Sequence, residues 1–184
     1  MGLGARLVIV ASIAWSIYYF PTALEPKSPQ SESWLFFDGV CNLCDGFVNF
    51  VADHDARRRV KFGALQRHRD LLVHHGAGRY AEGGEEELST LVLIQDGEVY
   101  VRSSAALRVL ALLDGPARAL ASLYVLPAPV RDLGYKLVAR YRYDVFGRAE
   151  TCRVPTGDFK SRFIEYDGPA AGGGDAPPFA ATAR

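Results

Sequence analysis

An apolar run at residues 34–37, Trp-Leu-Phe-Phe, stops at Asp38-Gly39 and leads directly into a segment with helical periodicity. Four large apolar residues bounded by turn residues suit a strand that is buried on both faces. Apolar side chains three and four positions apart make one stripe on the following helix. That stripe consists of Phe47, Val48, Phe50 and Val51. The pattern therefore predicts a strand, a turn and a helix over residues 34–55.

Two cysteines, Cys41 and Cys44, fall in the first turn of this predicted helix. The unpaired N–H groups and positive dipole end of a helix stabilise a thiolate, so a cysteine pKa there can fall to about 3.5–7.5. We expect Cys41 to be the nucleophile. Cys44 lies one turn later on the same face and can resolve a mixed disulfide. Asp38, at the end of the strand, could shuttle a proton to or from Cys44; capping of the helix or turn explains Asp38 equally well.

These residues also resemble a known family. The segment from Asp38 to Cys44, following an apolar strand, is similar to the Asp-x-x-Cys-x-x-Cys signature of the DCC family of predicted thiol-disulfide oxidoreductases. Later segments that resemble the same family are Asp96-Gly97, 103–107, 146–148, 152–155 and 161–163. The resemblance covers roughly Trp34 to Phe163. It implies a thioredoxin-like fold and a redox-active dithiol.

The remaining periodicity completes an α/β order. We expect strands at 60–65, 88–95 and 99–102, and helices at 105–113, 117–125 and 130–143. Asp96-Gly97 between the last two strands is typical of a tight hairpin turn. We therefore predict an α/β, thioredoxin-like fold, with a central mixed sheet flanked by helices and extra helices at the C-terminal end. The apolar residues Leu133, Leu137 and Tyr141, with Tyr135 and Val138 nearby, are expected to cover the sheet or the mouth of the active site.

Three further residues are candidates for substrate binding. Ser103 and Ser104 precede a predicted helix and resemble the positions at which glutathione-binding members of the thioredoxin-like superfold hold a substrate carboxylate; ordinary capping of that helix is the competing explanation. Thioredoxin-like enzymes usually carry a cis-proline just before the first strand of the hairpin, whereas this chain has Thr90 before Leu91. Thr90 could offer backbone and hydroxyl contacts instead.

The segment 7–24 carries no charge and is most apolar over 7–20. Its length lies between a signal-peptide core and a membrane span, and we interpret it as an uncleaved anchor or an organelle-targeting segment. A cleaved signal and an extra helix packed on the domain are the competing explanations. Residues 25–33 have the composition of a linker. The expected organisation is an anchor segment and linker at 1–33, a thioredoxin-like domain at 34–166 and a disordered tail at 167–184.

Composition limits the function classes. Among the 184 residues, Lys+Arg and Asp+Glu both number 21, so no net charge attracts nucleic acid. Three cysteines are too few for a disulfide-stapled scaffold. Cys152, the third, is either a further redox partner or a packed structural cysteine.

The leading hypothesis is a dithiol-disulfide oxidoreductase of the protein-disulfide reductase type, without cofactor or metal, acting on a protein or small-molecule thiol or disulfide. A second hypothesis is a structural zinc site formed by the three cysteines with one histidine. The candidate histidines are His54, His68, His74 and His75. A third hypothesis is a membrane-tethered interaction domain whose thiols are inactive.

Overall fold

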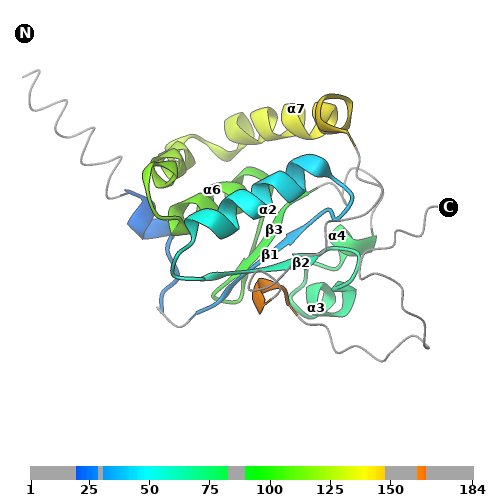
Figure 1. The fold of residues 1–184 in the computed structure, drawn as a ribbon, viewed down its shortest axis with the longest axis horizontal. Helices are drawn as coiled ribbons and strands as arrows, with labels where there is room; N and C mark the ends of the chain where they lie inside the picture. The colour runs from blue at the N-terminus through cyan, green and yellow to red at the C-terminus, as the bar shows by residue number, and fades with distance from the viewer. Residues whose placement is uncertain (1–19, 29–30, 83–89, 148–160, 165–184) are drawn as a thin grey trace, which may run out of the picture.

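The computed structural model describes residues 20–28, 31–82, 90–147 and 161–164 (Figure 1). Its elements, in chain order, are η1 (Phe20–Leu24), β1 (Ser33–Phe37), α2 (Asn42–His54), β2 (Val60–Ala64), α3 (Arg69–His74), α4 (Arg79–Glu82), β3 (Val92–Gln95), β4 (Glu98–Val101), α6 (Arg102–Leu112), η2 (Pro116–Val125) and α7 (Ala128–Phe146). Cys152 and the expected C-terminal tail at 167–184 lie outside the described residues.

The four strands form one mixed sheet in the order β2-β1-β3-β4. β1 runs parallel to β2 and antiparallel to β3, and β3 pairs with β4 as an antiparallel hairpin. Helices flank this sheet, as the α/β thioredoxin-like prediction requires, and the predicted fold class is confirmed. The parallel β1–α2–β2 unit brings the carboxyl ends of two neighbouring strands to the same edge of the sheet.

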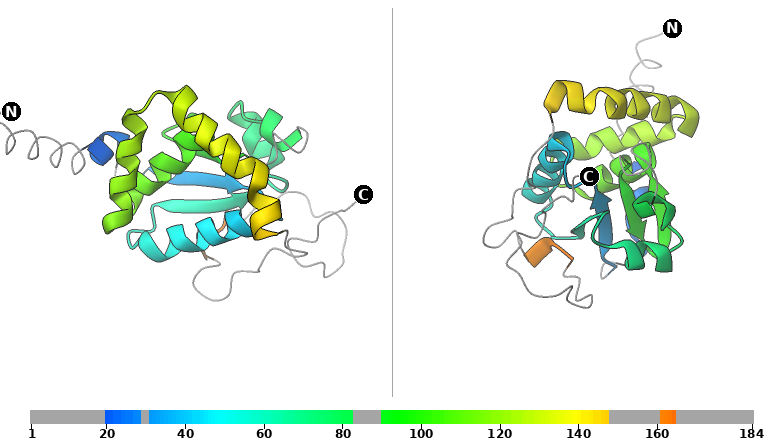
Figure 2. Two further views of the ribbon diagram at one scale, coloured as in Figure 1. Left: turned by 90° about the horizontal axis from the view of Figure 1, so that it is seen from above. Right: turned by 90° about the vertical axis from the view of Figure 1, so that its right-hand side faces the viewer.

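The apolar run of β1 is buried because helices cover both faces of the sheet. Leu35 and Phe37 pack against the core beneath α2 and α6, whereas Phe36 packs on the opposite side, against α3. Alternate residues of a strand point to opposite faces, so both sides of this strand need apolar side chains. Figures 1 and 2 show α3 and α4 on one side of the sheet, α2 and α6 on the other, and α7 outside that second layer.

The hairpin forms as predicted, but the helix after it begins earlier than expected. Asp96 and Gly97 have φ values of 53° and 79°, the left-handed conformation that a two-residue hairpin turn requires. α6 then starts at Arg102, directly after β4, with Val101 as its N-cap and no side-chain capping bond. Ser103 and Ser104 therefore lie inside the first turn, and their predicted capping role is wrong.

The expectation of a membrane anchor or targeting segment at 7–24 also needs correction. In the part of the chain that the structure describes, no helix is long and apolar enough to cross a membrane. The end of the segment, Phe20–Leu24, is a short 3₁₀ helix whose Leu24 is buried against α6 and η2. Glu25, expected in a linker, forms ion pairs with Arg59 and Arg118. Residues 1–19 lie outside the described residues.

α7 turns a polar side toward the protein. Leu133 and Leu137 are 71% and 60% exposed, and Tyr141 is also exposed, so these three residues cover neither the sheet nor the site. The side chains that α7 brings against the domain include those of Tyr135 and Arg142. Because the apolar pattern of this helix faces outward, its sequence periodicity misidentified the inner face.

Candidate active site

The candidate site lies at the carboxyl edge of the parallel strands. Asp38 follows β1 directly, and Gln66 comes shortly after the neighbouring strand β2. Cys41 is the N-cap residue of α2, with an extended backbone (φ −100°, ψ 115°). A tight turn between Asp38 and Cys41 is closed by a hydrogen bond from the Cys41 N–H to the Asp38 carbonyl, 3.3 Å long. The predicted strand, turn and helix therefore bring Asp38 and Cys41 to one edge of the sheet, where Gln66 also lies.

The two thiols face each other across the first turn of α2. The backbone N–H of Cys44 donates to the Sγ of Cys41 over 3.4 Å, so the thiol takes the place that a serine or aspartate oxygen usually takes at an N-cap. Both thiols are free. Cys41 is buried, with 1% of its surface exposed, and Cys44 is half-buried.

The electrostatics distinguish the two cysteines. The hydrogen bond from the Cys44 thiol, followed by the Cys44 backbone N–H and the positive charge of Arg142, lowers the pKa of Cys41 to about 6, against the opposing effects of burial and the Asp38 charge. The same thiol–thiol bond, together with burial, raises the pKa of Cys44 well above its usual range. At pH 7 Cys41 is therefore mostly thiolate and Cys44 is a thiol. This asymmetry is the one that a nucleophile and a resolving cysteine need.

Asp38 is buried, with 4% of its surface exposed, and accepts four hydrogen bonds. Its Oδ1 accepts from the Val40 N–H (3.2 Å) and the Gln66 side-chain amide (3.0 Å). Its Oδ2 accepts from Arg142 Nη2 (3.2 Å) and the Tyr143 hydroxyl (2.5 Å). The carboxylate caps its own turn through Val40, as one interpretation of the sequence expects; the proton-shuttle role stays a prediction.

Arg142 and Tyr143 belong to α7 and were not identified from the sequence. Arg142 is 3% exposed and forms a buried ion pair with Asp38. Burial, and then the bond to Asp38, raises the pKa of Tyr143 to about 12, so its hydroxyl stays protonated and remains a donor. The only sequence signal was the alternation Arg-Tyr-Arg-Tyr at 140–143, which does not distinguish a buried arginine from an exposed one.

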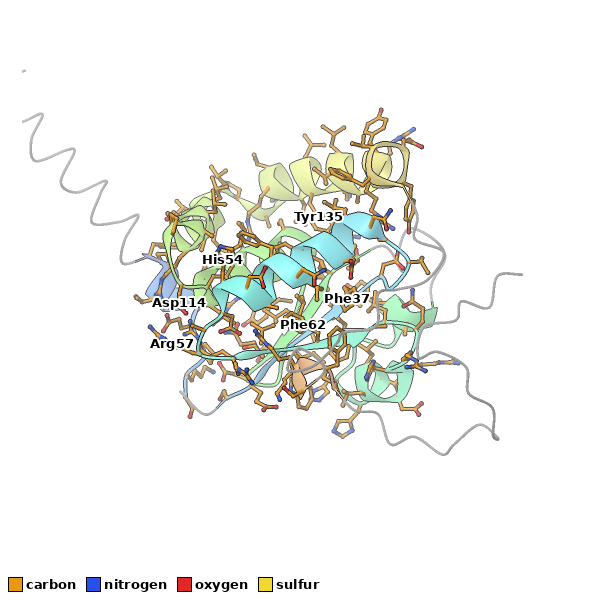
Figure 3. The ribbon with its side chains drawn as sticks, in the orientation of Figure 1. Phe37, His54, Arg57, Phe62, Asp114 and Tyr135 are labelled. Atoms are coloured by element: carbon orange, nitrogen blue, oxygen red, sulfur yellow. The ribbon has the colours of Figure 1, made fainter. Side chains whose placement is uncertain are left out.

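A cavity of about 160 Å³ opens beside Cys44, between α2, α6 and α7. Its lining residues are Leu43, Cys44, Phe47, Leu91, Ala106, Tyr135, Val138, Ala139 and Arg142. The backbone N–H of Leu91 donates to the hydroxyl of Tyr135 over 2.9 Å. Tyr135, labelled in Figure 3, lies on α7. Thr90, the residue before Leu91, is buried. The segment before β3 therefore does approach the thiols, and its Leu91 N–H is bonded to the Tyr135 hydroxyl of α7.

The remaining sequence candidates lie elsewhere or pair with α7. Ser103 donates to Asp132, and Arg131 donates to Ser103 (3.4 Å) and Ser104 (3.0 Å). These contacts tie α6 to α7. Among the described residues, no three His, Cys, Asp or Glu side chains form a cluster suited to a metal ion. Cys152, which the zinc hypothesis requires, is not among those residues.

The fold and the site together define a thioredoxin-like α/β protein with two closely spaced thiols where its first central strand meets a helix. The chain belongs to the DCC1-like thiol-disulfide oxidoreductase family, whose sequence model matches residues 35–148. This membership supports a role in thiol-disulfide redox chemistry.

Two relatives extend the comparison. The chain is 37% identical to "Uncharacterized protein YuxK" of Bacillus subtilis (strain 168) over 132 residues, which are 71% of this chain and 92% of the relative. It is 39% identical to "DCC family protein At1g52590, chloroplastic" of Arabidopsis thaliana over 123 residues, 65% of this chain and 68% of that protein. No solved structure gives a significant match.

Proposed function

We propose that this protein is a disulfide reductase in which Cys41 is the nucleophile, Cys44 the resolving thiol and Asp38 the proton acceptor. The observation that carries the proposal is the Cys41 Sγ at the N-terminus of α2, where it accepts the Cys44 N–H and has a pKa of about 6. Substrates of this site are protein or small-molecule disulfides. The reaction needs no cofactor, because the two thiols supply both electrons.

In the first step, the Cys41 thiolate attacks one sulfur of the substrate disulfide. A bond forms between Cys41 Sγ and that sulfur, the substrate S–S bond breaks, and the other half leaves as a thiolate that takes up a proton. A cysteine of pKa about 6 is roughly nine-tenths thiolate at pH 7, compared with about 3% for a thiol of pKa about 8.5. The first step therefore needs no general base.

In the second step, Cys44 loses its proton and its sulfur attacks Cys41 Sγ. The internal disulfide forms, and the second half of the substrate leaves as a thiolate and is protonated. The substrate has gained two electrons and the dithiol has lost two; an external thiol reductant returns the protein to its starting state. In the mixed disulfide Cys41 carries no charge, so the largest cause of the raised Cys44 pKa is gone, but burial and the Asp38 charge still raise it. Removal of the Cys44 proton is therefore the step that benefits most from a base.

Asp38 is the carboxylate best located for that task. Its negative charge contributes to raising the pKa of both thiols, so the three groups are electrostatically coupled. Among the hydrogen bonds of the described residues, none joins Asp38 directly to a sulfur. A proton travelling from Cys44 to Asp38 therefore needs at least one carrier between them, such as a water molecule.

Burial of Cys41 adds a condition on this chemistry. With 1% of its surface exposed, the sulfur cannot meet a substrate disulfide until the groups over it move. We expect Cys41 to react with iodoacetamide more slowly than its thiolate content implies, and mild urea to raise the rate without unfolding the protein. A rate in buffer equal to that of an unfolded peptide thiolate would contradict this condition.

The test of the function uses the full-length chain, a fluorogenic peptide disulfide as substrate and a limiting dithiol reductant. Cys41→Ser should abolish turnover. Cys44→Ser should accumulate a mixed disulfide between Cys41 and half of the peptide, visible as a mass increase that a reductant reverses. Full turnover by Cys41→Ser, or attachment of the peptide to Cys44 in the wild type, would refute the assigned roles.

A further inference from the structure

Arg142 occupies an unusual position on α7. Its flanking residues on the outer side of the helix, Arg140 and Tyr141, are exposed, whereas Arg142 is 3% exposed. Burying a guanidinium costs several kcal/mol unless anions and hydrogen-bond acceptors surround it. A buried arginine that is close to two thiols therefore needs an explanation from the groups it faces.

The first of those groups is Asp38. Arg142 Nη2 donates to the carboxylate Oδ2 over 3.2 Å and to the Tyr143 hydroxyl over 2.5 Å. The Tyr143 hydroxyl donates in turn to the same Oδ2 over 2.5 Å. Carboxylate, guanidinium and phenol thus form a closed triangle, which restricts the carboxylate and the guanidinium to one arrangement.

The dithiol is the second group. Arg142 lines the cavity beside Cys44, and its positive charge favours the ionised form of both Cys41 and Cys44. The coupling is mutual, because the bond to Tyr143 and the charges of the thiols raise the pKa of Arg142, against the opposing and larger single effect of burial. Among the described residues, the other titratable groups with a charge interaction with Cys41 are Cys44, Asp38 and Tyr135.

We propose that Arg142 is a positioning residue for the thiol-disulfide reaction: α7 holds its guanidinium between the Asp38 carboxylate and the dithiol, where it provides the positive charge opposite the Cys41 thiolate. This inference rests on the proposed function and adds α7 to the active site. The short Asp-x-x-Cys-x-x-Cys segment then contains two anions, Asp38 and the Cys41 thiolate, whose compensating cation comes from a helix about 100 residues later.

The negative charge that faces Arg142 changes through the cycle. In the reduced protein, one guanidinium faces both the Cys41 thiolate and the Asp38 carboxylate. When Cys41 enters a disulfide it becomes neutral, and the guanidinium then serves Asp38 alone. Arg142 keeps its proton throughout, so it changes the energy of the thiolate without supplying electrons or protons.

The test compares full-length Arg142→Gln with Arg140→Gln, which removes the same charge from the exposed side of the same helix. Thiolate absorbance and alkylation rate, followed against pH, report the pKa of Cys41. We expect Arg142→Gln to raise it by about one unit, to about 7, the low end of the effect of a nearby opposite charge, and Arg140→Gln to leave it unchanged. Arg142→Lys should restore most of the difference, because it keeps the charge.

The redox equilibrium with glutathione provides a second readout. A rise of the Cys41 pKa from about 6 to about 7 weakens the thiolate stabilisation of the reduced form about five-fold at pH 7. That factor corresponds to a reduction potential about 20 mV lower in Arg142→Gln. A general loosening of the site would shift both measurements in the same direction, because it would also weaken the hydrogen bonds that stabilise the thiolate. Arg142→Lys separates the two explanations, since it keeps the charge and should restore both the Cys41 pKa and the reduction potential.

Asp38→Asn should move the Cys41 pKa in the opposite direction, because it removes a negative charge. If Arg142→Gln does not fold, the double variant Asp38→Asn/Arg142→Gln replaces it in the test, because it lacks both buried charges. The Cys41 pKa of the double variant should then be higher than that of the single variant Asp38→Asn. An unmoved Cys41 pKa in either comparison overturns the role of Arg142. Turnover retained by Cys41→Ser refutes the proposed function, whatever Arg142 does.

Discussion

Replacing Asp38 with asparagine tests the buried ion pair that joins the dithiol segment to α7. The asparagine oxygen can still accept from the Val40 and Gln66 donors. The asparagine NH2 group then faces the Arg142 guanidinium, which loses its negatively charged partner. Asp38 and Arg142 are 4% and 3% exposed, so solvent does not screen the charge that remains. Removing one partner of such a pair costs about 3–5 kcal/mol. For a chain of this size, that loss lowers Tm by roughly 6–20 °C.

Urea unfolding of the reduced protein at pH 7 measures this change. Asp53→Asn is the matched control, since it makes the same substitution at an exposed position of α2 and should stay within about 0.5 kcal/mol of the wild type. The double variant Asp38→Asn/Arg142→Gln should lose about 1–3 kcal/mol less than the sum of the two single variants, because neither charge is left alone. A loss below about 1 kcal/mol for Asp38→Asn, or full additivity, would refute the argument.

Three further outcomes follow from individual contacts. Alkylation of Cys41 should rise with pH around a midpoint near 6, and a midpoint near 8.5 would contradict the site's electrostatics. Because the pKa of Cys41 is lower in the folded than in the unfolded protein, its ionisation stabilises the reduced fold fully above the unfolded pKa, and this stabilisation is lost as the pH falls through about 6. Gly63→Ala should destabilise the fold by about 1–3 kcal/mol in urea unfolding, since the added Cβ would lie 2.9 Å from the Phe36 ring. Gly46→Ala in α2 is the control and should be neutral or stabilising, because nothing lies within 4 Å of its added Cβ. Equal effects of the two substitutions would be inconsistent with tight packing at β2. Tyr135→Phe should cost about 1–3 kcal/mol in the same assay, because it deprives a backbone N–H of its acceptor, and no loss would mean that another group replaces the hydroxyl.

Local patterns predicted the fold because each one reports a preference that acts over a few residues. The apolar run before Asp38 requires a strand covered on both faces, and the strand β1 is covered in this way. Asp96-Gly97 requires a left-handed two-residue turn, and the hairpin has one. The predicted helix after the hairpin begins too late, because Ser103 and Ser104 suggest an N-cap. In the structure α6 begins at Arg102, and the Ser104 hydroxyl accepts a hydrogen bond from Arg131 of α7 instead of capping the helix.

The same reasoning could predict only half of the candidate site. Cys41, Cys44 and Asp38 lie within seven residues, so a strand, a turn and a helix are enough to bring them together. Arg142 and Tyr143 come from more than 100 residues later, and their role depends on which side of α7 faces the protein. That side cannot be predicted from hydrophobicity, because the exposed residues of α7 include its most apolar ones.

The sequence by itself determined the α/β class, the strand–turn–helix that carries the thiols and the membership of the DCC1-like family. These properties depend on short-range periodicity, turn residues and a compact motif. Only the tertiary structure decided that Cys41 is buried, that Arg142 is the partner of Asp38 and that the start of the described chain packs on the domain. Burial and charge pairing depend on contacts between segments far apart in the chain, and no local pattern specifies the free energy of bringing such segments together.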